Sequence, residues 1–165
     1  MAPATVDERN TQGLAPEEYV KQCAKAKANS LIGQVTQNDV VIGADTIVVL
    51  DGVIFGKPRD EAEARQMLTL LSGRTHRVLS AIAVVAKGIC TTDVIETKVT
   101  LTDIAAEQID RYVKTGEPLD KAGAYAVQGL GAIFVERIDG CYFAVVGLPL
   151  QALAKILTTI GVVLP

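Results

Sequence analysis

The chain has 165 residues, of which 49% are hydrophobic and 21% are charged, and its formal net charge is -3. This balance is typical of one folded globular domain and excludes a disordered chain. A mildly acidic chain also lacks the clustered basic surface that general nucleic-acid binding requires. No apolar run reaches the length of a membrane span, and the first residues do not resemble a secretory signal.

The few cysteines and the single histidine exclude several kinds of site. Cys23, Cys90 and Cys141 are far apart and form no CxxC pair, which argues against a disulfide framework or a zinc centre. His76 is the only histidine, so a His-rich metal site is excluded and a Ser-His-Asp triad is not expected. We therefore expect reduced thiols and a cytoplasmic protein.

The first predicted element is a helix that begins at Pro16, where proline suits the first turn and the following acids favour the N-terminal dipole. Val20 and Cys23 fall on one face of this helix at helical spacing, and Lys27 falls on the same face. An amine on an apolar stripe either reaches out to solvent or points into a site.

A β-branched run at Val40–Leu50 predicts a buried strand. Asp51 and Gly52 then form a hairpin turn into a short strand at Val53–Phe55. Asp60 is a predicted helix N-cap, and Glu63 completes a capping box at the start of the next helix.

The second half of the chain continues the alternation of strands and helices. Two strands are predicted at His76–Ala86 and Thr92–Leu101, followed by a helix that Asp103 caps. A glycine-rich stretch leads into a strand at Ala132–Ile138, and a helix after Pro149 closes the chain. The pattern predicts an α/β fold, with a mixed sheet and flanking helices.

Asp45 is the residue that fits least well into an apolar core. It interrupts the strand at Val40–Leu50, where an ionised carboxylate without partners is costly and attracts cations. Two interpretations remain at this point: a strand-end aspartate held by backbone N–H groups, or part of a site. Thr46 beside it is, by itself, an ordinary β-strand residue.

Other polar residues stand in loops, where a solvated surface is an equally simple explanation. Lys57 lies in a Gly-Lys-Pro turn that is not a phosphate-binding P-loop. Gly116–Tyr125 contains two acids and a lysine, for which a weak surface ion pair is the alternative. Gln128 carries an amide suited to a base edge, and Glu8 lies in a polar segment near the start.

Taken together, these segments resemble the Maf-like nucleotide pyrophosphatases. The order and spacing agree over essentially the whole chain, so we expect a single Maf-like domain over residues 1–165. The matching segments are Val6–Glu8, Ala24–Ala28, Gly43–Thr46, Phe55–Pro58, Met67–Gly73, Glu96–Val99, Gly116–Tyr125, Gln128–Gly129 and Val146–Pro149.

The resemblance implies hydrolysis of a nucleoside triphosphate to its monophosphate and pyrophosphate, with Mg²⁺ or Mn²⁺. It implies a sheet with two lobes around a cleft, often in a homodimer. Asp45 would be the general base or a ligand of the cation, together with Glu8. Lys57 would be a third catalytic residue and would line the phosphate pocket with Lys27 and Lys121. Thr46 and Gln128 would mark a preference for dTTP and UTP, and Glu117 and Asp120 would complete the substrate-binding residues.

One departure from the family pattern concerns the N-terminus. Family members begin with a strand and a Ser-x-Ser-Pro-Arg-Arg segment whose arginines and helix N-terminus bind phosphates. This sequence starts near the family's Val-Asp-Glu motif, so we expect an N-terminally truncated domain with an unpaired sheet edge. The alternatives are a catalytically impaired nucleotide-binding or regulatory module, or a house-cleaning pyrophosphatase for non-standard purine nucleotides.

Overall fold

A computed structural model describes residues 13–165, and its centre is a five-stranded antiparallel sheet with the strand order β2-β1-β3-β4-β5. Every pairing in this sheet is antiparallel, and the turn at Asp51–Gly52 joins β1 to β2 as predicted. The strands are β1 (Val40–Leu50), β2 (Val53–Phe55), β3 (Thr75–Ala86), β4 (Ile89–Leu101) and β5 (Val135–Asp139). The predicted α/β class is thus confirmed, but within residues 13–165 the sheet is antiparallel and not mixed.

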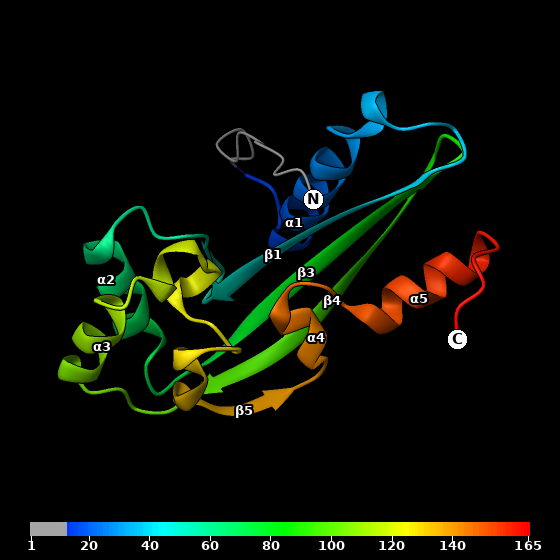
Figure 1. The fold of residues 1–165 in the computed structure, drawn as a ribbon. Coiled ribbons are helices and arrows are strands. Elements are labelled where there is room, and N and C mark those ends of the chain that lie inside the picture. The colour runs from blue at the N-terminus through cyan, green and yellow to red at the C-terminus, as the bar shows by residue number, and fades with distance from the viewer. Residues whose placement is uncertain (1–12) are drawn as a thin grey trace.

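Helices cover both faces of the sheet (Figure 1). The helices are α1 (Pro16–Asn29), α2 (Glu61–Leu71), α3 (Ala106–Val113), α4 (Tyr142–Val146) and α5 (Leu150–Thr159). Four 3₁₀ turns complete the described elements: Ile32–Gln34, Glu117–Asp120, Ala122–Ala124 and Leu130–Phe134. None of the helices in residues 13–165 is long and apolar enough to cross a membrane.

Side chains alternate between the two faces along β1, as the period of a strand requires. Val41, Ile47 and Val49 pack against α1 in one apolar cluster. Val48 and Leu50 point to the opposite face, into a cluster with α2 and α3. A third cluster joins β3 to α5 on that second face. This alternation decides which side of the sheet each polar residue of β1 reaches.

Local signals predicted the element boundaries with some errors. Asp60 caps α2 by accepting the N–H of Glu63 at 2.8 Å, but the Glu63 carboxylate accepts the N–H of Arg59 instead of closing the capping box on Asp60. The predicted cap of α3 by Asp103 is wrong. That helix begins at Ala106, and the side chain of Gln108 accepts the N–H of Ala105 at 3.0 Å.

The edge of the sheet is important for the site. β2 pairs only with Val48–Leu50, so no strand within residues 13–165 pairs with the outer side of β1 from Val40 to Ile47. Asp45 and Thr46 lie on this edge segment, and their side chains point to opposite faces.

Candidate functional site

Close packing of α1 on β1 brings Lys27 to Asp45. A Cβ added at Gly43 would lie 2.2 Å from the carbonyl oxygen of Ala24 and 2.6 Å from the nitrogen of Ala28, so only glycine permits this approach. Lys27 in the last turn of α1 then forms an ion pair with Asp45. The Asp45 side chain is only 9% exposed and that of Lys27 is 29% exposed. The carboxylate in the apolar strand is thus compensated by an amine from the helix.

A cavity of about 420 Å³ surrounds this ion pair and opens around the edge of β1. Asp45, Lys27 and Tyr19 line it on the α1 face of the sheet, whereas Thr46 and Gly147 line it from the opposite face. The loops after β2 and after α3 close its remaining side. The segments that contribute are therefore far apart in the sequence.

A backbone contact joins the two loops that carry Lys57 and Lys121. The N–H of Gly123 donates to the carbonyl of Gly56 at 3.0 Å. Gly123 has a φ of +69°, and a Cβ there would lie 2.9 Å from the Val48 side chain, so this loop packs tightly against β1. Both lysines line the cavity as a result.

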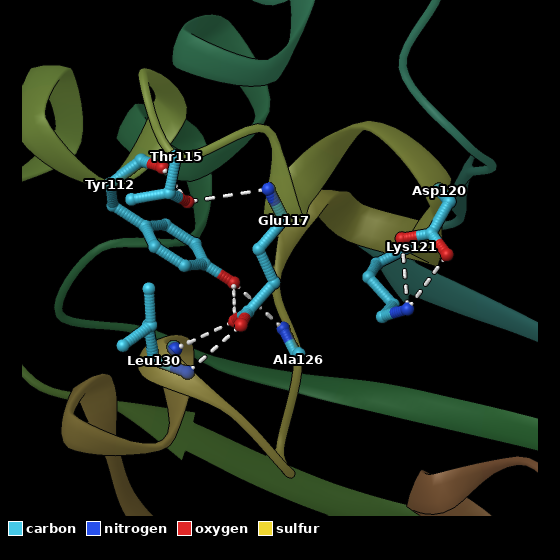
Figure 2. Close-up of polar contacts among 8 residues, drawn as sticks. Tyr112, Thr115, Glu117, Asp120, Lys121, Ala126 and Leu130 are labelled. Atoms are coloured by element: carbon cyan, nitrogen blue, oxygen red, sulfur yellow. Dashed lines mark hydrogen bonds and ion pairs between the residues drawn. The ribbon is translucent and has the colours of Figure 1, made fainter.

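Asp120 adds a second carboxylate to the cavity wall. Its oxygens lie 2.8 and 2.9 Å from Nζ of Lys121, in the ion pair drawn in Figure 2. The hydrogen bond from Lys121 lowers the pKa of Asp120, burial opposes this, and the charges of Lys121 and Lys57 lower it further. Both lysines therefore act on the same carboxylate, although the pair is exposed and adds little to stability.

Glu117 is not among the residues that line the cavity. Its carboxylate accepts hydrogen bonds from the Tyr112 hydroxyl at 2.8 Å and from the N–H groups of Leu130 and Gly131 at 3.0 Å (Figure 2). The same Tyr112 oxygen accepts the N–H of Ala126 at 3.0 Å. We call these residues, Tyr112, Glu117, Ala126, Leu130 and Gly131, the Glu117 brace. It fixes the loop that carries Lys121 and Gln128.

Tyr125 forms part of the cavity wall and is backed by the only histidine of the chain. Nε2 of His76 lies 2.8 Å from the Tyr125 hydroxyl, and both residues are buried. Burial lowers the pKa of His76 from 6.5 to about 4, so the ring is neutral at pH 7. The sequence suggested no role for His76, and the structure gives it one in supporting the wall.

The predicted site residues divide into three groups. Glu117 belongs to the brace, and Glu8 lies outside the described residues. The structure brings together at one cavity Asp45, Thr46, Lys27, Lys57, Asp120, Lys121 and Gln128. Sequence reasoning missed Tyr19, Tyr125 and Gly147, which carry no signal that separates them from ordinary core or turn residues.

The cavity offers two carboxylates, those of Asp45 and Asp120, to a cation. No group of three or more His, Cys, Asp or Glu residues within 13–165 is placed to bind a metal ion. Mg²⁺ at nucleotide sites is commonly bound by one or two carboxylates together with phosphate oxygens of the substrate. The two carboxylates fit a cation of that kind and do not form an all-protein cage.

Comparison with known proteins shows which family this chain belongs to. A dTTP/UTP pyrophosphatase of Bacillus pumilus is 48% identical over 155 residues, which are 94% of this chain and 82% of the relative. One of Clostridium beijerinckii is 46% identical over 146 residues, 87% of this chain and 78% of the relative. One of Dictyoglomus thermophilum is 43% identical over 163 residues, which are 98% of this chain and 84% of the relative. The model of the family described as Maf-like protein matches residues 1–160, and this chain belongs to that family.

Proposed function

We propose that this protein is a nucleoside triphosphate pyrophosphatase that converts dTTP and UTP to the monophosphate and pyrophosphate. The observation that carries the proposal is the convergence of Lys27, Lys57 and Lys121 with the buried Asp45 on one cavity. Three amines suit a polyphosphate, whose charge they neutralise. The names of the relatives specify the nucleotides.

The amines act on the leaving group. Cleavage between the first and second phosphates places new negative charge on the departing pyrophosphate. Lys57 and Lys121 stand on loops that one backbone hydrogen bond joins, so the backbone segments that carry both amines are held together at the cavity before substrate arrives. Fixed charges of this kind stabilise a transition state without reorganisation during the reaction.

Asp45 is the residue proposed to accept the proton of the attacking water. The water oxygen joins the phosphorus of the monophosphate, the bond to pyrophosphate breaks, and one proton of the water passes to the Asp45 carboxylate. Lys27 keeps that carboxylate in place through the ion pair. Bound Mg²⁺ or Mn²⁺ would polarise the phosphate oxygens; Asp45 and Asp120 offer carboxylates to it from the cavity wall, and Glu8 is proposed as a further ligand.

The nucleobase is proposed to bind at the other end of the cavity. Thr46 points to the face of the sheet opposite Asp45, and Gln128 lines the cavity as well. An amide and a hydroxyl give the site directional hydrogen bonds, which discriminate between bases better than apolar packing does.

Release of pyrophosphate from a panel of nucleotides tests the proposal. UTP and dTTP should give pyrophosphate in the presence of Mg²⁺ or Mn²⁺, chelation should abolish the release, and Asp45→Asn should reduce it at least about 100-fold. Tight binding of UTP without any release would contradict the proposal and support the non-catalytic nucleotide-binding module. Faster turnover of deaminated purine nucleotides would favour the house-cleaning alternative.

Two further proposals concern the location and the oligomeric state of the protein. The first is a cytoplasmic location, which Cys90 and Cys141 support because they are free thiols and the cytoplasm is reducing. The family resemblance suggests a homodimer, and light scattering after size-exclusion chromatography tests it directly. A monomer mass at all concentrations would contradict this second proposal.

A further inference from the structure

Ser80 is a fully buried hydroxyl beside the cavity that the proposed mechanism does not use. It lies in β3 directly opposite Thr46 of β1, and its side chain is 0% exposed. The two hydroxyl oxygens are 2.7 Å apart. The Ser80 hydroxyl also donates a hydrogen bond to the carbonyl oxygen of Ala144 in α4. A chain of three polar groups thus runs from the cavity into the core.

The direction of this chain follows from the number of protons. A serine hydroxyl has one proton to donate, and a carbonyl oxygen can only accept. Ser80 therefore uses its proton on Ala144, and the hydrogen bond between the hydroxyls must be donated by Thr46. The Thr46 hydroxyl has then spent its only proton, and towards the cavity it presents lone pairs alone.

The space beside this hydroxyl is open to a ligand. Thr46 is half-buried and lines the cavity. Gly147, at a φ of +118°, lies next to it, and a Cβ on this glycine would be 3.8 Å from the Thr46 hydroxyl oxygen. A side chain at position 147 would therefore contact this hydroxyl, and the glycine leaves that space open.

We infer that Ser80 determines pyrimidine specificity by fixing Thr46 as a hydrogen-bond acceptor for the N3–H of uracil and thymine. The inference rests on the proposed function and deepens it. Uracil and thymine carry a proton on N3, whereas the N3 of cytosine is an acceptor. Two acceptors facing one another in a partly desolvated site repel, so CTP is disfavoured relative to UTP.

The test compares kcat/KM for UTP, CTP and 3-methyl-UTP, in which a methyl group replaces the N3 proton. The wild-type protein should prefer UTP to both others by about tenfold or more. In Ser80→Ala the Thr46 hydroxyl regains a free proton, which it can turn towards cytosine N3. The ratio of UTP to CTP turnover should then fall about tenfold, with UTP turnover largely retained.

A matched control and a double variant separate specificity from packing. Thr75→Ala removes one partner of another cross-strand hydroxyl pair in β3, 2.8 Å from Thr100 and away from the cavity. It should leave the UTP to CTP ratio unchanged. Thr46→Val should lower the ratio, and adding Ser80→Ala to it should change the ratio no further, because Ser80 acts through Thr46.

Several results would overturn the inference. These are an unchanged ratio in folded Ser80→Ala, an equal loss for UTP and CTP, or wild-type turnover of 3-methyl-UTP equal to that of UTP. If Ser80→Ala does not fold, the 3-methyl-UTP comparison and Thr46→Val decide. If the wild-type protein releases no pyrophosphate, the proposed function fails by itself. Calorimetric binding of α,β-methylene UTP against its cytidine counterpart then still tests the specificity.

Discussion

Replacing Glu117 by glutamine tests whether this residue braces a loop or contacts the substrate. The carboxylate accepts three hydrogen bonds, two on Oε1 from Tyr112 and Gly131 and one on Oε2 from Leu130. A glutamine has one acceptor oxygen and an NH₂ group that can only donate. In either orientation its NH₂ group faces at least one backbone N–H, and that hydrogen bond is lost.

The expected cost follows from these contacts. A donor left without an acceptor costs about 1–3 kcal/mol, and the remaining bonds lose the strength that a charged acceptor provides. Because Glu117 is only partly buried, we expect a loss in the middle of this range and not at its upper end, about 2 kcal/mol in the free energy of unfolding. For a chain of this length this corresponds to a decrease of about 4–8 °C in Tm.

The contribution of the Glu117 carboxylate to stability should also depend on pH. Burial tends to raise the pKa of Glu117, but the hydrogen bonds from Leu130, Gly131 and Tyr112 outweigh it and hold the pKa below the ordinary value of 4.5. A carboxylate with a lowered pKa in the folded state stabilises the protein above pH 4.5, and this contribution disappears as the pH falls through the folded value. The stability difference between wild type and Glu117→Gln should therefore narrow below pH 4.5.

Denaturant unfolding at pH 7 and at pH 4 measures both effects. Glu136→Gln in β5 removes the same charge from an exposed position, and it should change stability by no more than about 0.5 kcal/mol. If Glu117→Gln unfolded like the wild type while its KM for UTP rose strongly, the brace would be refuted. Glu117 would then contact the nucleotide, as the family resemblance implied.

Three other predictions concern the cavity and its support. Asp45→Asn should abolish turnover while Tm stays within a few degrees of the wild type, and near-normal rates would show that Asp45 is not the base. Gly43→Ala should lower the free energy of unfolding by about 1–3 kcal/mol and raise KM for UTP, because a Cβ would push α1 and its Lys27 away from Asp45. Gly33→Ala is the control, and it should change neither stability nor KM because the space around Gly33 is open. Between pH 6.5 and 4 the free energy of unfolding of the wild type should fall by roughly 3 kcal/mol. Over this range His76 binds a proton in the unfolded protein, whereas the buried ring of the folded protein, with its pKa of about 4, stays neutral. Unfolding of His76→Gln over this range should show a correspondingly smaller pH slope, and an identical slope would contradict the assignment.

The sequence by itself predicted most of the elements and most of the polar residues of the site, but it missed α4 and began the strand β5 three residues too early, within the 3₁₀ turn at Leu130–Phe134. The β-branched run at Val40–Leu50, the turn after it and the cap at Asp60 are local signals, and local backbone preferences suffice to read them. The ordered motifs selected Asp45, Lys57 and Lys121 without any knowledge of their contacts. Errors arose where neighbours in space decide, as at Asp103, whose carboxylate lies beside Gly73 while Ala105 is the N-cap of α3.

Only the tertiary structure decided what these residues face. Neighbouring strand residues point to opposite faces of the sheet, yet Asp45 and Thr46 line one cavity because it lies at a sheet edge. Glu117 is assigned to the brace because Leu130 and Gly131 fold back onto it. The direction of the Thr46 hydroxyl depends on Ser80 and on the carbonyl of Ala144 in α4, which lies 64 residues after Ser80 in the chain. Hydrogen bonds between distant segments are properties of the packed fold, and no local pattern encodes them.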